Sequence, residues 1–274
     1  MPQIIVTTSR KATGELHARA ERWAERLRGR YVERRGRSIE TIVNDESAEA
    51  GQQIDGVVVV TPERVSYHAP QTGLEFFFHP NMARTRIHNI ADGRGDPMIT
   101  AMDLHEGDAV LDCTLGRAGD AIVVAHIVGD SGKVVGIEVV PVVAQLTIAG
   151  LAEYMDPSKA VTAAMRRIEA HEAGYQEFLP TCADGSFDVV YFDPIFDRPL
   201  TLSDAMAPLR AVADRSPLDP RTVTEALRVA RRRVVIKQRK GTPLWETLKV
   251  DEVIAGPGSR IEYGIAIKRD PAVG

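Results

Sequence analysis

The residues that follow one apolar run carry the clearest chemical signal in this chain. Residues 187–196 read FDVVYFDPIF, so an apolar run stops abruptly at Asp193, Pro194, Ile195 and Phe196. A carboxylate, a proline and an aromatic ring then lie at the carboxyl end of a predicted buried strand, the edge at which open α/β sheets bind ligands. An acceptor beside a flat ring suits a planar group that carries an NH2, such as a nucleobase.

Small and acidic residues follow an earlier predicted strand. Residues 110–120 read VLDCTLGRAGD and lead into an apolar helix predicted at 121–127. Small residues let the backbone approach a ligand closely, and the start of a helix offers free N–H donors. The loop lacks the GxGxxG pattern, because position 118 is alanine, which disfavours a pyrophosphate ligand. The residues expected to bind a cofactor here are Asp112, Thr114, Gly116, Gly119 and Asp120.

An acidic residue, Glu138, ends the next predicted strand, 19 positions after Gly119. A carboxylate at that place can accept hydrogen bonds from ribose hydroxyls, and it repels a 2′-phosphate. Asp112 would lie near a phosphate of a dinucleotide, but it suits S-adenosylmethionine (SAM), which carries a sulfonium and an ammonium group and no phosphate. Asp112, Glu138 and Asp193 each end a predicted strand, so the sequence predicts a SAM site.

The elements that position these residues alternate between strand and helix from about residue 98. Five strands separated by segments that can form helices predict a largely parallel, doubly wound α/β sheet. The last two strands are joined only by residues 256–260, which is too short for a parallel crossover, so they form an antiparallel hairpin. The strand candidates are residues 109–113, 133–139, 167–171, 187–193, 233–238, 250–255 and 261–268.

The first 80 residues have the pattern of a separate small α/β unit. Apolar, β-rich runs predict strands at residues 4–8, 56–60 and 74–78. A helix is predicted within residues 12–29, with Thr13 as its N-cap and Gly29 at its end. A basic, partly helical connector over residues 81–97 then leads to the domain of residues 98–274.

Composition restricts the class of protein. The 274 residues are 44% hydrophobic and 26% charged, which is ordinary for a soluble enzyme, and no apolar run is long enough to span a membrane. The two cysteines and the scattered histidines predict neither a disulfide framework nor a metal site. The N-terminus lacks the apolar segment of a secretory signal, so we expect a cytoplasmic protein.

The distribution of charge is uneven although the net charge is −4. Residues 1–37 hold ten Lys/Arg against four Glu, and residues 231–240 read RRRVVIKQRK. Basic faces on an acidic protein indicate a polyanion bound on one side, such as a nucleic acid. Solvated helix surfaces are the alternative interpretation of the same arginines.

Together these motifs resemble those of class I SAM-dependent methyltransferases, whose loop is commonly D-x-x-x-G-x-G and whose amino-methylating members carry (N/D/S)PP(Y/F). LDCTLGRAGDA, GRGDP, VVYFDPIF and VVIKQR are similar to motifs of the bacterial small-subunit ribosomal RNA guanine-N2 methyltransferases and their uncharacterised relatives. The resemblance covers about residues 80–268. It implies a Rossmann-like methyltransferase sheet, mostly parallel with an antiparallel C-terminal hairpin, SAM as cofactor and RNA, specifically ribosomal RNA, as substrate.

The resemblance also implies roles for individual residues. Asp112, Gly116 and Asp120 fall in the SAM loop, Glu138 takes the ribose, and Glu172 stands in the segment whose family counterpart contacts adenine. The expected catalytic residues are Asp193 and Pro194, with the Pro194 or the Ile195 backbone carbonyl joining Asp193 as acceptor of the N–H bonds of the target amine, and Phe196, which stacks on the base. The expected substrate contacts are Arg94, Ile195 and Lys237. Ile195, in place of a second proline, favours the guanine-N2 branch.

Other functions stay open at this level. A methyltransferase acting on a protein amide or a small molecule could use the same Asp-Pro-x-Phe motif, because a carboxamide also presents an NH2. A non-catalytic SAM-binding protein is a further alternative, since Ala118 and Gly174 depart from the family's motifs. A nicotinamide-dependent dehydrogenase is disfavoured by the loop spacing and by the C-terminal hairpin.

Overall fold

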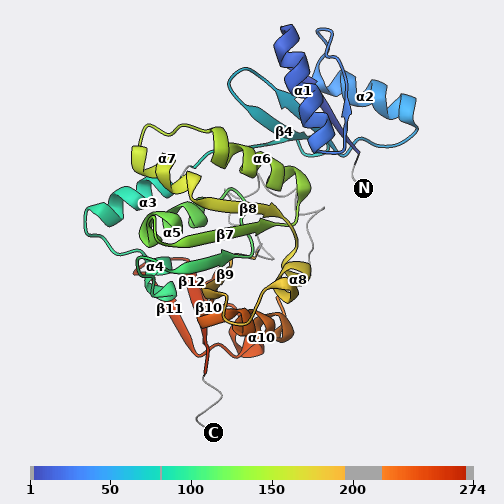
Figure 1. Cartoon of the computed structure of the whole chain (residues 1–274). Helices are drawn as coiled ribbons and strands as arrows, with labels where there is room; N and C mark the ends of the chain where they lie inside the picture. Colours follow the sequence, from blue (N-terminus) through green and yellow to red (C-terminus); the bar gives the residue numbers. More distant parts are fainter. Residues whose placement is uncertain (1–2, 81, 195–217, 270–274) are drawn as a thin grey trace. The chain divides into compact units, whose positions relative to one another are not determined.

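Runs of aliphatic and β-branched residues form two sheets, one in each of the two units into which the chain divides (Figure 1). The computed structural model describes residues 3–80, 82–194 and 218–269. Of these, the first unit contains residues 3–78 and Val140–Thr147, and the second unit contains the others.

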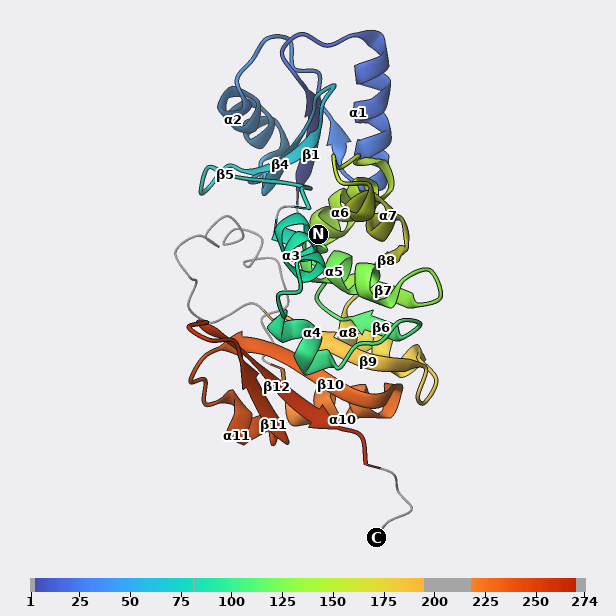
Figure 2. The ribbon, with the colours of Figure 1, turned by 90° about the vertical axis from the view of Figure 1, so that its left-hand side faces the viewer.

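The first unit is built on a mixed sheet. In chain order its elements are β1 (Ile4–Thr8), α1 (Gly14–Arg26), β2 (Arg30–Tyr31), α2 (Ile39–Ala50), β3 (Gly56–Val60), β4 (Val65–Ala69) and β5 (Leu74–Phe77). The described strands have the order β2-β1-β3-β4-β5, with β2, β1 and β3 parallel and β4 and β5 antiparallel. Ile5, Val57 and Val59 pack with Ile42 of α2, and α1 covers the other face (Figure 2).

Local sequence signals account for part of this unit. The hydroxyl of Thr13 accepts a hydrogen bond from the Leu16 backbone N–H at 3.4 Å, so Thr13 caps α1 as predicted. The sequence pattern predicts neither α2 nor β4. β4 carries the polar residues Ser66 and His68, and it becomes a strand because it pairs with the strongly apolar β3. Tertiary pairing overrides a weak local preference there.

The elements that follow residue 81 alternate between strand and helix from about residue 98, as predicted. In chain order they are α3 (Met82–Ala91), α4 (Pro97–Met102), β6 (Ala109–Asp112), α5 (Gly119–Val128), β7 (Lys133–Glu138), α6 (Pro141–Glu153), α7 (Lys159–Arg166), β8 (Ile168–Glu172), α8 (Tyr175–Phe178), the 3-10 helix η1 (Leu179–Thr181), β9 (Phe187–Phe192), α10 (Pro220–Val229), β10 (Ala230–Arg239), α11 (Leu244–Leu248), β11 (Glu252–Ala255) and β12 (Ile261–Ile267).

The sheet of the second unit confirms the predicted architecture. The described strands have the order β8-β7-β6-β9-β10-β12-β11. The first five of that order are parallel, and β12 runs antiparallel to both β10 and β11. Figure 1 shows α3, α5 and α7 on one side of this sheet and α8 and α10 on the other. This is the Rossmann-like arrangement with an antiparallel C-terminal hairpin.

Alternation along the central strands decides which side chains leave the hydrophobic core. Leu111 of β6 and Ile236 of β10 belong to the buried cluster that includes the apolar face of α10. Successive side chains of a strand point to opposite faces of the sheet. Asp112 and Lys237, which follow them in the sequence, therefore project toward the face covered by α5.

Two kinds of feature are not found in the part of the chain that the structure describes. None of its helices is both long and apolar enough to cross a membrane. No group of three or more His, Cys, Asp or Glu side chains there is arranged to hold a metal ion.

Candidate active site

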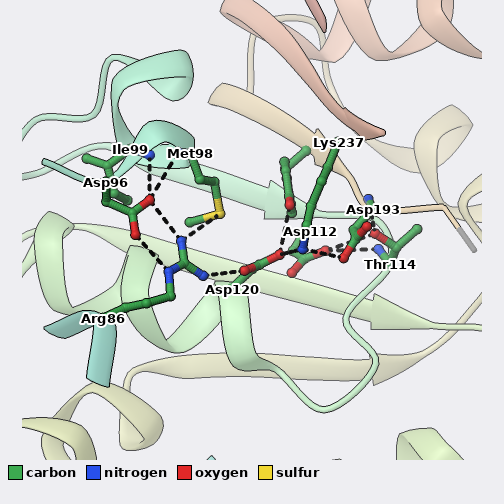
Figure 3. A network of polar contacts seen from close by, with 10 residues as sticks. Arg86, Asp96, Met98, Ile99, Asp112, Thr114, Asp120, Asp193 and Lys237 are labelled. Atoms are coloured by element: carbon green, nitrogen blue, oxygen red, sulfur yellow. Dashed lines mark hydrogen bonds and ion pairs between the residues drawn. The ribbon is translucent and has the colours of Figure 1, made fainter. Parts of the chain in front are cut away.

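The register of the parallel strands brings distant site residues together. Phe192 of β9 pairs with Ile236 of β10, so Asp193 lies beside Lys237 at the carboxyl edge of the sheet. Asp112 ends β6, the neighbour of β9 on its other side. Figure 3 shows the side chains of Asp112, Asp193 and Lys237 converging. Three strands thus supply one cluster of charged groups.

The loop after β6 folds back so that α5 begins beside these strand ends. Gly116 (φ +51) and Ala118 (φ +59) both have left-handed backbone conformations, which an alanine adopts at a cost of about 1–2 kcal/mol. The Gly116 N–H donates to the Glu138 carboxylate at 2.9 Å. No side chain caps α5, and a Cβ added at Gly119 would meet no atom within 4 Å. Ala118 thus has a left-handed backbone at the position where the resembling family's loop motif commonly has its second glycine.

Asp112 is a buried carboxyl group, with only 3% of the residue exposed. Its Oδ1 accepts a hydrogen bond from the Thr114 N–H at 3.0 Å. Burial nevertheless raises the pKa of Asp112 to about 8. A cationic ligand would favour its ionised form. The carboxylates of Asp112 and Glu138, together with the open helix start, fit the ammonium and ribose groups of SAM.

Thr114 joins the cofactor loop to the end of β9. Its hydroxyl accepts the Asp193 backbone N–H at 2.6 Å and lies 3.4 Å from Oδ1 of Asp112. A single side chain therefore connects the expected cofactor carboxylate with the expected catalytic one. Pro194 follows Asp193 directly and is partly buried.

Lys237 lies between two carboxylates. Its Nζ donates to Asp193 Oδ2 at 2.8 Å and to Asp120 Oδ2 at 3.0 Å. Burial lowers the pKa of Lys237, but the two carboxylates outweigh burial and raise that pKa above its ordinary value. Burial raises the pKa of Asp193, whereas attraction to Lys237 and Arg86 outweighs burial and lowers the pKa of Asp120.

Arg86 of α3 extends the cluster on the far side of Asp120 (Figure 3). Its guanidinium forms an ion pair with Asp120 and another with Asp96, where Nε lies 2.7 Å from Oδ2. Asp96 is also the N-cap of α4. The Tyr191 hydroxyl donates to Asp120 at 2.8 Å. The carboxylate of Asp120 is therefore held by three side chains from β9, β10 and α3.

Some predicted residues lie elsewhere. Arg94 is exposed and donates to Asn89 and Asp92 in its own segment. Glu172, by contrast, ends β8 in register with Glu138 of β7, so its exposed side chain belongs to the same edge of the sheet as the predicted cofactor residues. The predicted catalytic Phe196 and the predicted substrate contact Ile195 lie outside the described residues.

Sequence reasoning missed Arg86, Asp96 and Tyr191 as members of the site. Arg86 and Asp96 fall in the segment that the sequence predicts to be a connector. One signal was available: three carboxylates at one sheet edge need cations nearby, because buried like charges repel one another. The sequence does not say which arginine supplies the charge.

The chain is similar in sequence to one protein family and to individual bacterial proteins. The sequence model of a family described as "putative SAM-dependent methyltransferase" matches residues 51–263. The uncharacterised protein YpiP of Bacillus subtilis (strain 168) is 38% identical over 242 residues, 88% of this chain and 91% of that protein. Ribosomal RNA small subunit methyltransferase J of Hydrogenovibrio crunogenus is 25% identical over 216 residues, 77% of this chain and 76% of that protein.

A solved structure is similar over nearly the whole chain. The crystal structure of the SAM-dependent methyltransferase NGO1261 from Neisseria gonorrhoeae has a TM-score of 0.64 and covers 98% of this chain and 99% of its own. At 15% sequence identity this likeness shows the fold alone. The extent of the family match and of the YpiP identity carries the assignment: this chain belongs to the family of SAM-dependent methyltransferases, with SAM as its cofactor.

Proposed function

We propose that this enzyme methylates an exocyclic amine of an RNA base, with guanine N2 of ribosomal RNA as the target, in the cytoplasm. The position of Asp193 carries the proposal. Its carboxylate follows β9, is 30% exposed, and is tied through Thr114 to the cofactor loop. The name of the Hydrogenovibrio relative, a ribosomal RNA methyltransferase, supports RNA as the substrate.

The residues at the end of β9 can overcome the main chemical difficulty of this reaction. A conjugated NH2 is a poor nucleophile, because its lone pair is delocalised into the ring. SAM supplies an electrophilic methyl group on a cationic sulfonium. Asp193 and the Pro194 carbonyl can accept the two N–H bonds, which favours a pyramidal nitrogen and fixes its orientation. Such orientation and electrostatic preorganisation can offset roughly 7–11 kcal/mol of a barrier.

The proposal gives the remaining predicted residues their roles. Phe196 stacks on the base, which contributes roughly 1–3 kcal/mol, and Ile195 takes part in substrate binding. Arg94 contacts the RNA backbone, and residues 1–80 form an RNA-binding unit. Because the reacting amine must reach Asp193, the target base is unpaired or flipped out of its helix.

The test is mass-spectrometric mapping of ribosomal RNA nucleosides from strains with and without the gene. We expect one N2-methylguanosine to be lost on deletion and restored by the native gene. The Asp193→Ala enzyme should bind SAM normally but transfer methyl at least about a hundredfold more slowly. An unchanged nucleoside map, or full turnover by folded Asp193→Ala, would contradict the proposal. Transfer to protein or small molecules alone would favour the alternative substrates.

A further inference from the structure

Asp193 is held at two points, its backbone N–H and one oxygen of its carboxylate. Its backbone N–H donates to Thr114 Oγ1 at 2.6 Å, and Oδ2 accepts from Lys237 at 2.8 Å. Among the residues that the structure describes, none donates a hydrogen bond to Oδ1. The carboxylate can therefore accept from an incoming N–H without losing its partner.

Lys237 is itself fixed from the opposite side. Asp120 binds its Nζ, and Asp120 is bound in turn by Arg86, which also pairs with Asp96. Charges thus alternate along five side chains from α4 to the end of β9, and Figure 3 shows them in one row. Lys237 and Asp120 are 20% and 15% exposed, so solvent screens their attraction less than it would on an open surface.

We propose that Lys237 is a positioning residue for methyl transfer: its ammonium, held by Asp120, orients the Asp193 carboxylate and keeps it ionised toward the target amine. The inference rests on the proposed function, and it replaces the direct substrate contact predicted for Lys237 from the sequence. The other charged or titratable groups that act on this pair come from every neighbouring element: Arg86 (α3), Asp112 (β6), Asp120 (α5), Tyr191 (β9) and Tyr263 (β12).

Removing the ammonium group of Lys237 should raise the pKa of Asp193. An adjacent cation lowers the pKa of a carboxyl group by roughly one to three units. In Lys237→Met the pKa of Asp193 therefore rises. The acidic limb of the kcat profile should move upward by at least about one pH unit. Above that limb we expect kcat to fall about tenfold or more, with KM for RNA and for SAM changed less than about twofold.

Two further variants separate positioning from general stability. Lys237→Arg keeps the charge and should return the acidic limb to within a few tenths of a pH unit of its native position. Lys268→Met removes a partly buried lysine that directly follows β12 and whose Nζ, within the described residues, donates to the carbonyls of Leu227, Arg228 and Ala230. It should lower stability without moving the limb. Lys237→Gln serves as a second neutral variant if Lys237→Met does not fold.

The decisive measurement does not require the RNA substrate. Carbon-13 NMR titration of the aspartate carboxyl groups, assigned with Asp193→Asn, gives the pKa of Asp193 in the native and Lys237 variants. The inference is supported if the pKa of Asp193 rises in the neutral variants and keeps its native value in Lys237→Arg. This holds even if the native enzyme fails to methylate RNA and the proposed function is wrong. An unmoved pKa of Asp193 in folded Lys237→Met or Lys237→Gln overturns it.

Discussion

At the scale of one residue, the buried carboxyl group of Asp112 lowers the stability of the fold when it is ionised. Burial raises its pKa to about 8, against roughly 3.9 for an unfolded chain. Asp112 therefore ionises less readily in the folded protein than in the unfolded chain. It leaves the free energy of unfolding undiminished below about pH 4 and lowers it progressively as the pH rises toward 8. We expect Asp112→Asn to stabilise the protein by an amount that grows by up to about 4 kcal/mol between pH 5 and pH 8. Urea unfolding at both pH values measures it, and an equal gain at both would argue against the buried charge.

The same carboxyl group should make SAM binding depend on pH. If Asp112 pairs with the ammonium of SAM, its proton must leave on binding. Affinity should then weaken by roughly tenfold per pH unit below pH 8. Titration calorimetry in buffers of different ionisation enthalpy measures the released proton. Asp112→Asn should bind SAM more weakly and without this pH dependence, and a flat profile in the native enzyme would remove Asp112 from the ammonium site.

At the scale of elements, the connection between the β6–α5 loop and β9 depends on one hydroxyl. Thr114→Val keeps the shape of the side chain but leaves the Asp193 N–H without its acceptor, which costs about 1–3 kcal/mol for a buried group. We expect a lower unfolding free energy and a slower methyl transfer, because Asp193 loses its anchor. Thr114→Ser should restore both. Thermal unfolding measures the change in stability, and single-turnover experiments measure the rate of methyl transfer. Equal stability and equal rates in the Val and Ser variants would refute the role of the hydroxyl.

The segment predicted as a basic, partly helical connector, residues 81–97, overlaps with α3 and with the first residue of α4. Helices α3 (Met82–Ala91) and α4 (Pro97–Met102) belong to the second unit. Their arginines carry specific contacts: Arg84 pairs with Asp156, and Arg86 pairs with Asp96 and Asp120. The local sequence is basic and weakly periodic, so the partners of these arginines could not be recognised from it.

At the scale of the whole molecule, much of the positive charge read from the sequence is compensated. The arginines of the basic run in β10 form ion pairs with aspartates. Several arginines of the first unit also form ion pairs with acidic residues. The pairs are Arg231–Asp188, Arg232–Asp108, Arg233–Asp103, Arg30–Glu46, Arg35–Glu33 and Arg37–Asp45. Within residues 3–80, 82–194 and 218–269, neither Arg10 nor Lys11 forms an ion pair. Among the exposed basic residues of the first unit that form no such pair, we choose these two neighbours as the candidates to test for RNA contact.

Salt dependence tests that assignment in the full-length enzyme. Filter binding of ribosomal RNA should weaken steeply with salt, because each phosphate contact releases counterions. Replacing both Arg10 and Lys11 with alanine should reduce the slope of log K against log salt by roughly 1.5. Arg35→Ala, which removes an exposed arginine already paired with Glu33, is the control and should leave the slope nearly unchanged. An unchanged slope in the double variant would exclude this surface as an RNA contact.

The sequence by itself determined the order of strands along the chain, the hairpin and the cofactor loop, because alternation, glycines and chain length act locally. It also placed Asp112, Glu138 and Asp193 at strand ends. Only the tertiary structure decided which charges meet there. Lys237 and Asp120 are 117 positions apart, and Arg86 and Asp120 are 34 apart. Contacts over such separations depend on strand register and helix packing. The motif FDVVYFDPIF therefore predicts that the Asp193 carboxylate is functional, whereas only the tertiary structure shows which cations bind it and its neighbours.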